Sequence, residues 1–267
     1  MHQHRFSNDR RPRRVLITLT VGVAAAALLV MAAAPASSEP AASQALAAPP
    51  PGHTQRIGGD HDASIERTPR GFRAGASEIT TPLPEGYPDP SPPGAIDLKT
   101  YPSVRRAEVS SDVNADLGMN VAFWPLFQHI QRHDIAMTSP VEMDYRGMTA
   151  RLSDDAADVP NQEPERLEWT MSFLYRTPDL NDTGEEGVVR IVDTAPVTVV
   201  AIAYRGAYTT TNVAAHAAEL AAFIEAHPQL EPAGEPRALF YNGPEKRSRD
   251  KWAEVQIPVR VIAPEQR

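Results

Sequence analysis

The sequence contains no cysteine, and this absence removes several kinds of chemistry at once. Disulfide bonds, zinc–thiolate sites, iron–sulfur clusters and a cysteine nucleophile are all excluded. An anchor built on a lipid-modified cysteine after a hydrophobic segment is excluded as well. The folded part must therefore be held together by its apolar core rather than by covalent cross-links.

Positive charge is scarce beyond the N-terminal stretch, and motifs of known catalytic sites are missing. The formal net charge is −8, and five arginines lie among the first 14 residues, so the rest of the chain is more acidic still. A protein that binds duplex DNA usually presents a basic face, and none is visible in the second half. GxSxG, P-loop and GxGxxG patterns are also absent. We therefore expect no nucleic-acid partner, and a ligand-binding protein rather than an enzyme.

The first 36 residues have the pattern of an export signal or a membrane anchor. A basic run over residues 1–14 precedes an uncharged stretch over 15–36 that is rich in Leu, Val and Ala. Ala34-Pro35-Ala36 offers a cleavage site, whereas the stretch also has about the 20 residues that a membrane-spanning helix needs. In both cases we expect the folded part outside the cytoplasmic membrane. It is then anchored to the membrane if the segment is retained, and periplasmic or secreted if it is cleaved.

Residues 37–95 are rich in Ala, Pro, Ser and Gly, and their apolar residues follow no period. Proline clusters such as Pro49-Pro50-Pro51 and Pro92-Pro93 favour extended backbone. This composition is typical of a segment that cannot bury enough surface to fold. We expect a disordered linker over 37–95, followed by one folded domain over 96–264.

From Ile96 on, strand-like and helix-like patterns alternate in two series. The first series has a strand over 102–109, a helix over 117–133 and strands over 136–145 and 167–175. After a strand over 188–192, the second has a strand over 197–204, a helix over 212–227 and strands over 238–242 and 252–261. Each series runs strand, helix, strand, strand, which predicts an α+β fold with an antiparallel sheet that carries both helices.

Three segments of this folded part carry a family resemblance. They are Tyr101–Arg106 in the first strand, Phe123–Ile130 in the first helix, and Ile135–Val141, which reads Ile-Ala-Met-Thr-Ser-Pro-Val. Together they resemble the SOUL haem-binding protein family, which typically has a very similar Met-Thr-x-Pro-Val stretch after an aromatic-rich helix. The resemblance runs from Tyr101 to Val261. It implies two pseudo-repeated β-α-β-β units that form a distorted, barrel-like antiparallel sheet with two helices.

The same resemblance implies that haem or a related tetrapyrrole binds as a ligand in a shallow hydrophobic groove beside the first helix. Haem needs an apolar slot and, optionally, an axial ligand such as His, Met or Tyr. Phe123 and Phe127 fall on the apolar stripe of that helix. His129 and His133 share one flank, with His133 nearer the stripe and His129 nearer solvent. The candidate binding residues are these four and Met137.

Several alternatives remain open at this point. The two histidines are either a haem ligand or weak metal pair, or ordinary surface residues near a helix C-terminus. The ligand is alternatively another small apolar molecule, which an enzyme of this wider fold group would hydrolyse with a buried glutamate. Glu142 and Glu168 lie on predicted strands and are candidates for that role, although a salt-bridged or exposed glutamate explains them equally. A further hypothesis is that the folded part is a protein–protein interaction module of the cell envelope. The sequence does not indicate the oligomeric state.

Overall fold

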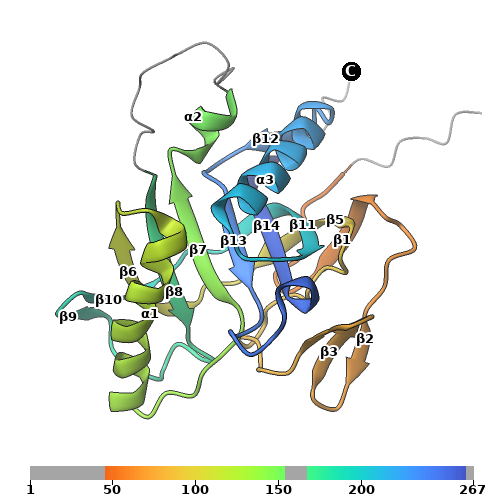
Figure 1. The fold of residues 1–267 in the computed structure, drawn as a ribbon. Helices are drawn as coiled ribbons and strands as arrows, with labels where there is room; N and C mark the ends of the chain where they lie inside the picture. The colour runs from red at the N-terminus through yellow and green to blue at the C-terminus, as the bar shows by residue number, and fades with distance from the viewer. Residues whose placement is uncertain (1–45, 154–166, 263–267) are drawn as a thin grey trace, which may run out of the picture. The chain divides into compact units, whose positions relative to one another are not determined.

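A computed structural model describes residues 46–153 and 167–262, which belong to a compact unit beginning at Gln44 (Figure 1). The basic run at 1–14 and the apolar stretch at 15–36 lie outside these residues. In the part of the chain that the structure describes, no helix is both long enough and apolar enough to cross a membrane.

The unit is built on an 11-stranded sheet whose neighbouring strands pair antiparallel. The order is β1-β5-β11-β14-β13-β7-β8-β6-β10-β9, and β12 pairs with β14. This path has two ends, so the described strands do not pair into a closed barrel, and the predicted barrel-like shape stays a prediction. The strands are β1 (Thr54–Gly59), β5 (Ala95–Tyr101), β6 (Arg105–Ser111), β7 (Val141–Arg146), β8 (Glu168–Leu174), β9 (Gly184–Glu186), β10 (Val189–Asp193), β11 (Val197–Arg205), β12 (Leu230–Pro232), β13 (Arg237–Phe240) and β14 (Trp252–Val261).

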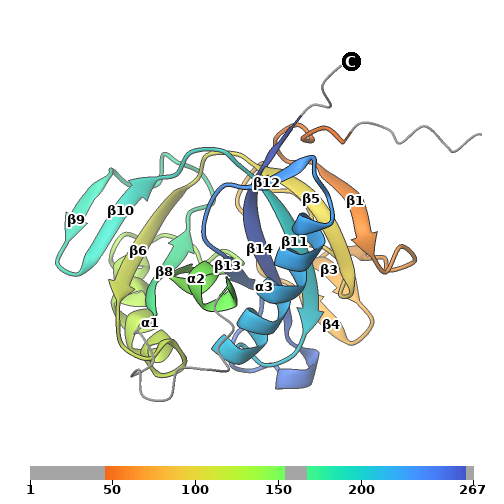
Figure 2. The ribbon, with the colours of Figure 1, turned by 90° about the horizontal axis from the view of Figure 1, so that it is seen from above.

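Two long helices, α1 (Ala115–Arg132) and α3 (Thr210–Glu225), lie over one face of this sheet (Figure 2). α1 packs on β6, β8 and β10, whereas α3 packs on β14, β11 and β12. A short helix, α2 (Met148–Ser153), contacts α3, and a 3₁₀ turn (Ser248–Asp250) precedes β14. The core between helices and sheet contains buried side chains from both helices, among them Leu126 and Leu220.

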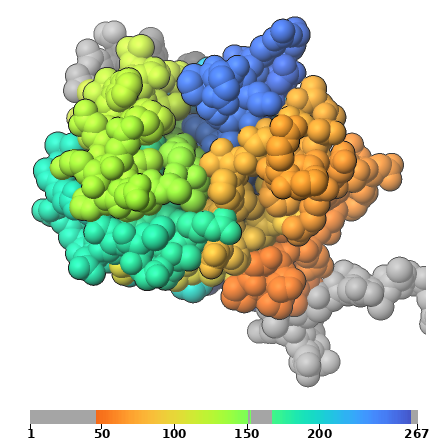
Figure 3. Space-filling model, turned by 90° about the horizontal axis from the view of Figure 1, so that it is seen from below, coloured from red at the N-terminus to blue at the C-terminus, as the bar shows by residue number. Residues whose placement is uncertain are grey.

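The opposite face of the sheet is covered by the N-terminal part of the unit. Residues 60–92 cross it and include a small sheet of β2 (Glu66–Thr68), β3 (Gly71–Ala74) and β4 (Ser77–Ile79). A second core lies between this segment and the large sheet, and it contains Ile79 and Trp252. Figure 3 shows the segment, in orange, occupying much of one face of the unit.

The prediction of a disordered linker over 37–95 is wrong from Thr54 onward. β1 pairs with β5, and the indole N–H of Trp252 donates to the backbone oxygen of Ser91 over 2.9 Å. The physical reason is that scattered apolar side chains need no period when they dock singly on the face of a sheet. Ile65, Phe72 and Leu83 are partly buried in this way.

The α+β prediction is confirmed, and the predicted strands and helices from 117 onward recur with shifted ends. Along the chain, β6 is followed by α1, β7 and β8. In the same way, β11 is followed by α3, β13 and β14, and β12 lies between α3 and β13. In the sheet, β8 lies between β6 and β7, and β14 lies between β11 and β13. The idea that these two series are copies of one unit stays a prediction.

Candidate functional site

The structure distributes the predicted binding residues over two flanks of α1. Phe123 and Phe127 stack with a centroid distance of 5.6 Å, and Phe123 meets the ring of Phe173 on β8 at 5.2 Å. Both phenylalanines and Met137 are partly buried against the main core. His129 and His133 lie on the other flank, toward β9. The five residues therefore do not form one site.

His129 is fully buried, which corrects the prediction that it lies nearer solvent than His133. Its Nε2 lies 2.6 Å from the hydroxyl of Tyr175, and its Nδ1 lies 3.0 Å from Oε2 of Glu186 on β9. His133 is one-third exposed, and its Nε2 lies 2.9 Å from Oε1 of Glu186. The helical period places both histidines on one flank, but it cannot show that a downstream strand covers the first of them.

The electrostatics of this cluster favour a neutral imidazole beside a charged carboxylate. Burial lowers the pKa of His129, and the neighbouring Glu186 opposes part of that shift. The hydrogen bond from His133 lowers the pKa of Glu186. At neutral pH, His129 therefore keeps an electron pair on one ring nitrogen and Glu186 keeps its charge. Glu186 is a residue that sequence reasoning missed, because β9 is short and polar and its sequence has the pattern of a turn.

A groove runs along this flank of α1 and joins the histidine cluster to an apolar stretch. One part, of about 620 Å³, is lined by Pro125, Gln128, Arg132, His133, Glu186, Gly187, Val188 and Val189. The adjoining part, of about 240 Å³, is lined by Val109, Ser110, Ser111, Val113, Gly118, Val121, Ala122, Pro125, Trp169 and Val188. Pro125 and Val188 belong to both, and we call the whole the α1 groove.

Large apolar side chains are unusually exposed around the α1 groove. Val121 is 72% exposed and Val188 is 70% exposed, and both line the groove. Leu117 and Trp124 lie exposed on the outer side of the same helix. Exposed apolar clusters of this kind mark binding surfaces more often than scattered single residues do. One end of the groove thus offers apolar contact, and the other end offers Arg132, His133 and Glu186.

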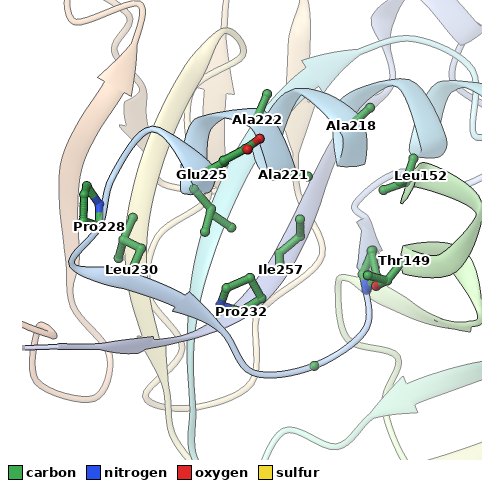
Figure 4. A pocket seen from close by; sticks show the side chains of 13 residues that line it. Thr149, Leu152, Ala218, Ala221, Ala222, Glu225, Pro228, Leu230, Pro232 and Ile257 are labelled. Carbon is green, nitrogen blue, oxygen red and sulfur yellow. The ribbon is translucent and has the colours of Figure 1, made fainter. Parts of the chain in front are cut away.

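A second cavity, of about 580 Å³, lies beside α3 (Figure 4). We call it the α3 cavity. It is mostly apolar, and Glu225 is the one charged side chain among its described lining residues. The lining comprises Thr149, Leu152, Ala218, Ala221, Ala222, Ile224, Glu225, Pro228, Leu230, Pro232, Gly234, Pro236 and Ile257.

The two glutamates considered for hydrolysis are both held in ion pairs. Glu142 is buried and paired with Arg106 and Arg237, whereas the exposed Glu168 meets Arg146 at 2.8 Å. Neither lines the α1 groove or the α3 cavity. These contacts agree with the interpretation of both residues as salt-bridged or exposed glutamates.

A buried carboxylate that sequence reasoning missed is Glu254 on β14. It accepts hydrogen bonds from the Lys99 ammonium at 2.8 Å, the Tyr241 hydroxyl at 2.8 Å and the Ser91 backbone N–H at 2.7 Å. Lys99 and Glu254 are both fully buried on the side of the N-terminal segment. A charge inside the apolar strand 252–257 was a signal for this pair. Its oxygens are saturated, so it holds the structure together rather than binding a ligand.

Comparison with known proteins identifies the family of the chain. Residues 91–258 match the family described as SOUL heme-binding protein, whereas no curated protein matches the chain. The C-terminal domain of EcmrR is 16% identical, with a TM-score of 0.48 over 62% of this chain and 98% of that one. In an EcmrR–DNA complex the match covers only 57% of the EcmrR chain.

A hydrolase encoded by lin2189 from Listeria innocua is 12% identical, with a TM-score of 0.43 over 61% of this chain and 91% of that one. Likenesses this remote carry no conclusion about function. The family match is different in kind, because it covers more than half of the chain and includes the segments that carried the resemblance in the sequence. The chain belongs to the SOUL haem-binding protein family.

Proposed function

We propose that this protein binds haem or a related tetrapyrrole in the α1 groove, without catalysing a reaction on it. The observation that carries the proposal is an open groove in a member of a haem-binding family, with one apolar end and one polar end that holds Arg132. A tetrapyrrole has a flat apolar ring and carboxylate side chains. The exposed Val121 and Val188 suit the ring, and Arg132 suits a propionate.

Apolar contact supplies most of the affinity in this proposal. Burial of apolar surface stabilises a complex by about 25 cal/mol per Å². A histidine contributes little, since His129 is fully buried and a ring in the groove does not reach it, while the ring of His133 is held by Glu186. Phe123, Phe127 and Met137, which were predicted to bind the ligand, then pack α1 against the main core and do not contact the tetrapyrrole ring.

The α3 cavity is the basis of a second proposal, binding of a different small apolar ligand. Its volume lies within the range of roughly 300–1,000 Å³ that is usual for ligand pockets. Glu225 at its edge favours a neutral or cationic molecule, whereas it repels the propionates of haem. We propose no hydrolysis there, because the lining holds no paired nucleophile and base among the described residues.

We also propose that the folded unit lies outside the cytoplasmic membrane. The support is the order of a basic run and an uncharged apolar stretch in the first 36 residues. The segment would attach the protein to the membrane if it is retained. A reporter enzyme that is active only in the periplasm, fused to the C-terminus, should be active. Activity of a cytoplasm-only reporter in its place would contradict the proposed location.

Hemin titration followed by absorbance tests the groove. Val188→Asp and Val121→Asp each place a carboxylate on the apolar wall, and each should weaken binding by about tenfold, because apolar contact is lost and the propionates are repelled. Ile262→Asp is the control, since Ile262 is also an exposed apolar residue but lines neither cavity. Equal binding by all three variants and the wild type would contradict the α1 groove. Loss of binding in Ala221→Trp alone would move the site to the α3 cavity.

A further inference from the structure

We propose that His129, His133 and Glu186 bind a single divalent transition-metal ion of the Zn²⁺ class. Each of the three residues offers one ligand atom, and these atoms all lie within 4.8 Å of one another. The proposal does not rest on tetrapyrrole binding, because it uses donor atoms of the protein alone and needs no ring in the groove, although His133 and Glu186 also line the α1 groove.

The distances between the donor atoms already approach those of a metal site. The Glu186 carboxylate lies 3.0 Å from Nδ1 of His129 and 2.9 Å from Nε2 of His133. Zinc bonds of 2.0–2.2 Å at a tetrahedral angle place neighbouring ligand atoms about 3.4 Å apart. On the two edges that join Glu186 to the histidines, metal binding therefore requires shifts of a few tenths of an ångström. The two histidine nitrogens lie within 4.8 Å of each other, so they must approach by at most about 1.4 Å. The side chains of His133 and Glu186 are both about one-third exposed and have room to make them.

The surroundings hold one ligand rigidly, as metal sites commonly do. His129 and His133 are four residues apart on α1, so the helix sets the spacing of the two rings. The Tyr175 hydroxyl, 2.6 Å from Nε2 of His129, fixes the buried ring with Nδ1 toward Glu186. An oriented partner on the second ring nitrogen is typical of histidines that bind metals, and its removal usually lowers affinity by roughly 10–100-fold.

The donor set selects the class of ion. Two imidazoles and one carboxylate suit Zn²⁺, Ni²⁺ or Cu²⁺, whereas Mg²⁺ and Ca²⁺ prefer sites made of oxygen atoms alone. Three protein ligands leave one position open, and His133 and Glu186 both line the wider part of the α1 groove. Water or an external donor entering from the groove completes the coordination. The competing explanation is a metal-free hydrogen-bond cluster that attaches β9 to α1.

Zinc titration separates these two explanations. The full chain is first stripped of metal with a chelator, and zinc binding is then measured by competition with a chromophoric chelator. His2 and His4 form a second histidine pair in the sequence, so every protein in the test also carries His2→Ala and His4→Ala. The parent should bind one equivalent of Zn²⁺. Glu186→Gln and His133→Ala should each weaken that binding by more than about tenfold, and Tyr175→Phe should weaken it by about tenfold.

His216→Ala is the matched control, because His216 and Glu219 form a helical His–Glu pair at 3.4 Å that has no third ligand among the described residues. It should bind Zn²⁺ like the parent. Zinc should also raise the unfolding temperature of the parent and of His216→Ala. Glu186→Gln should still unfold in a cooperative transition, which shows that it is folded, but zinc should not raise its unfolding temperature. Absence of one-equivalent binding in the parent, or equal affinity in parent, Glu186→Gln and His133→Ala, would overturn the proposal. Hemin titration of the same proteins reports on tetrapyrrole binding independently.

Discussion

The two faces of the large sheet are built differently. The helix-bearing face carries the α1 groove, the α3 cavity and the cluster of His129, His133 and Glu186. The other face is closed by residues 60–92, and it buries the ion pair of Lys99 and Glu254. The described cavities and the half-exposed donors lie on the first face, while the buried ion pair lies on the second. The comparison indicates that ligand binding and stability depend on opposite sides of one sheet.

Removal of the covering segment should have the largest effect. A chain that starts at residue 93 would expose the apolar side chains of Val199, Leu239 and Trp252 to water. We expect it to be unfolded or insoluble, whereas a chain that starts at Gln44 should unfold like the full protein. Circular dichroism and urea unfolding would measure both. Equal stability of the two truncated chains would contradict the role assigned to this face.

Breaking the buried ion pair should have the next largest effect. Lys99→Met leaves the Glu254 carboxylate buried without its cation and should lower the free energy of unfolding by about 3–5 kcal/mol. Adding Glu254→Gln should recover part of that loss, because no unpaired charge then stays buried. Lys246→Met, at a half-exposed lysine 3.9 Å from Glu78, serves as the control and should change little. A loss as small as that of the control would show that the pair contributes no stability.

A surface ion pair should contribute much less. Arg105 binds both carboxylate oxygens of Asp193 at 2.8 Å, and this hydrogen bonding lowers the pKa of Asp193. Since the carboxyl titrates at lower pH in the folded state, its contribution is present above about pH 4 and is lost as the pH falls through the folded pKa. Asp193→Asn should therefore cause a small loss in the free energy of unfolding by urea at pH 7, and this loss should shrink as the pH is lowered below about 4. A loss that stays equal as the pH is lowered would exclude a role for the charge.

Substitutions in the α1 groove should change stability least. Val188→Asp alters an exposed side chain, so its free energy of unfolding should stay within about 0.5 kcal/mol of the wild type. The same variant is expected to bind hemin more weakly. Urea unfolding and hemin titration of one preparation would show the two effects separately. A destabilisation as large as that of Lys99→Met would mean that the two faces do not divide their roles.

The sequence predicted the elements that rest on periodicity and missed the contacts that do not. The helix 117–133 and the strand 167–175 recur because tertiary packing follows their apolar pattern. Residues 60–92 were misjudged because single apolar residues between prolines leave no period. A signal was nevertheless present in a strand of the large sheet. The continuous apolar run over 199–203 in β11 indicates a strand that is covered on both faces.

The candidate site was predicted in part for the same reason. His129 and His133 were paired correctly by helical spacing, but their relative exposure was reversed. Tyr175 directly follows β8 and Glu186 ends β9, and no local pattern links such distant positions to the histidines. The apolar lining of the groove from Val121 and Val188 was also unforeseen, because it joins a helix to a turn far along the chain.

The central claim is that a tetrapyrrole binds beside α1, and paramagnetic line broadening in NMR spectra tests it most directly. Hemin iron broadens the methyl signals of residues close to it. At saturation, the signals of Val113, Val121 and Val188 should disappear, while those of Leu230 and Ile257 in the α3 cavity should persist. Broadening of Leu230 and Ile257 instead would place the ligand beside α3. Absence of any saturable change would contradict tetrapyrrole binding by this protein.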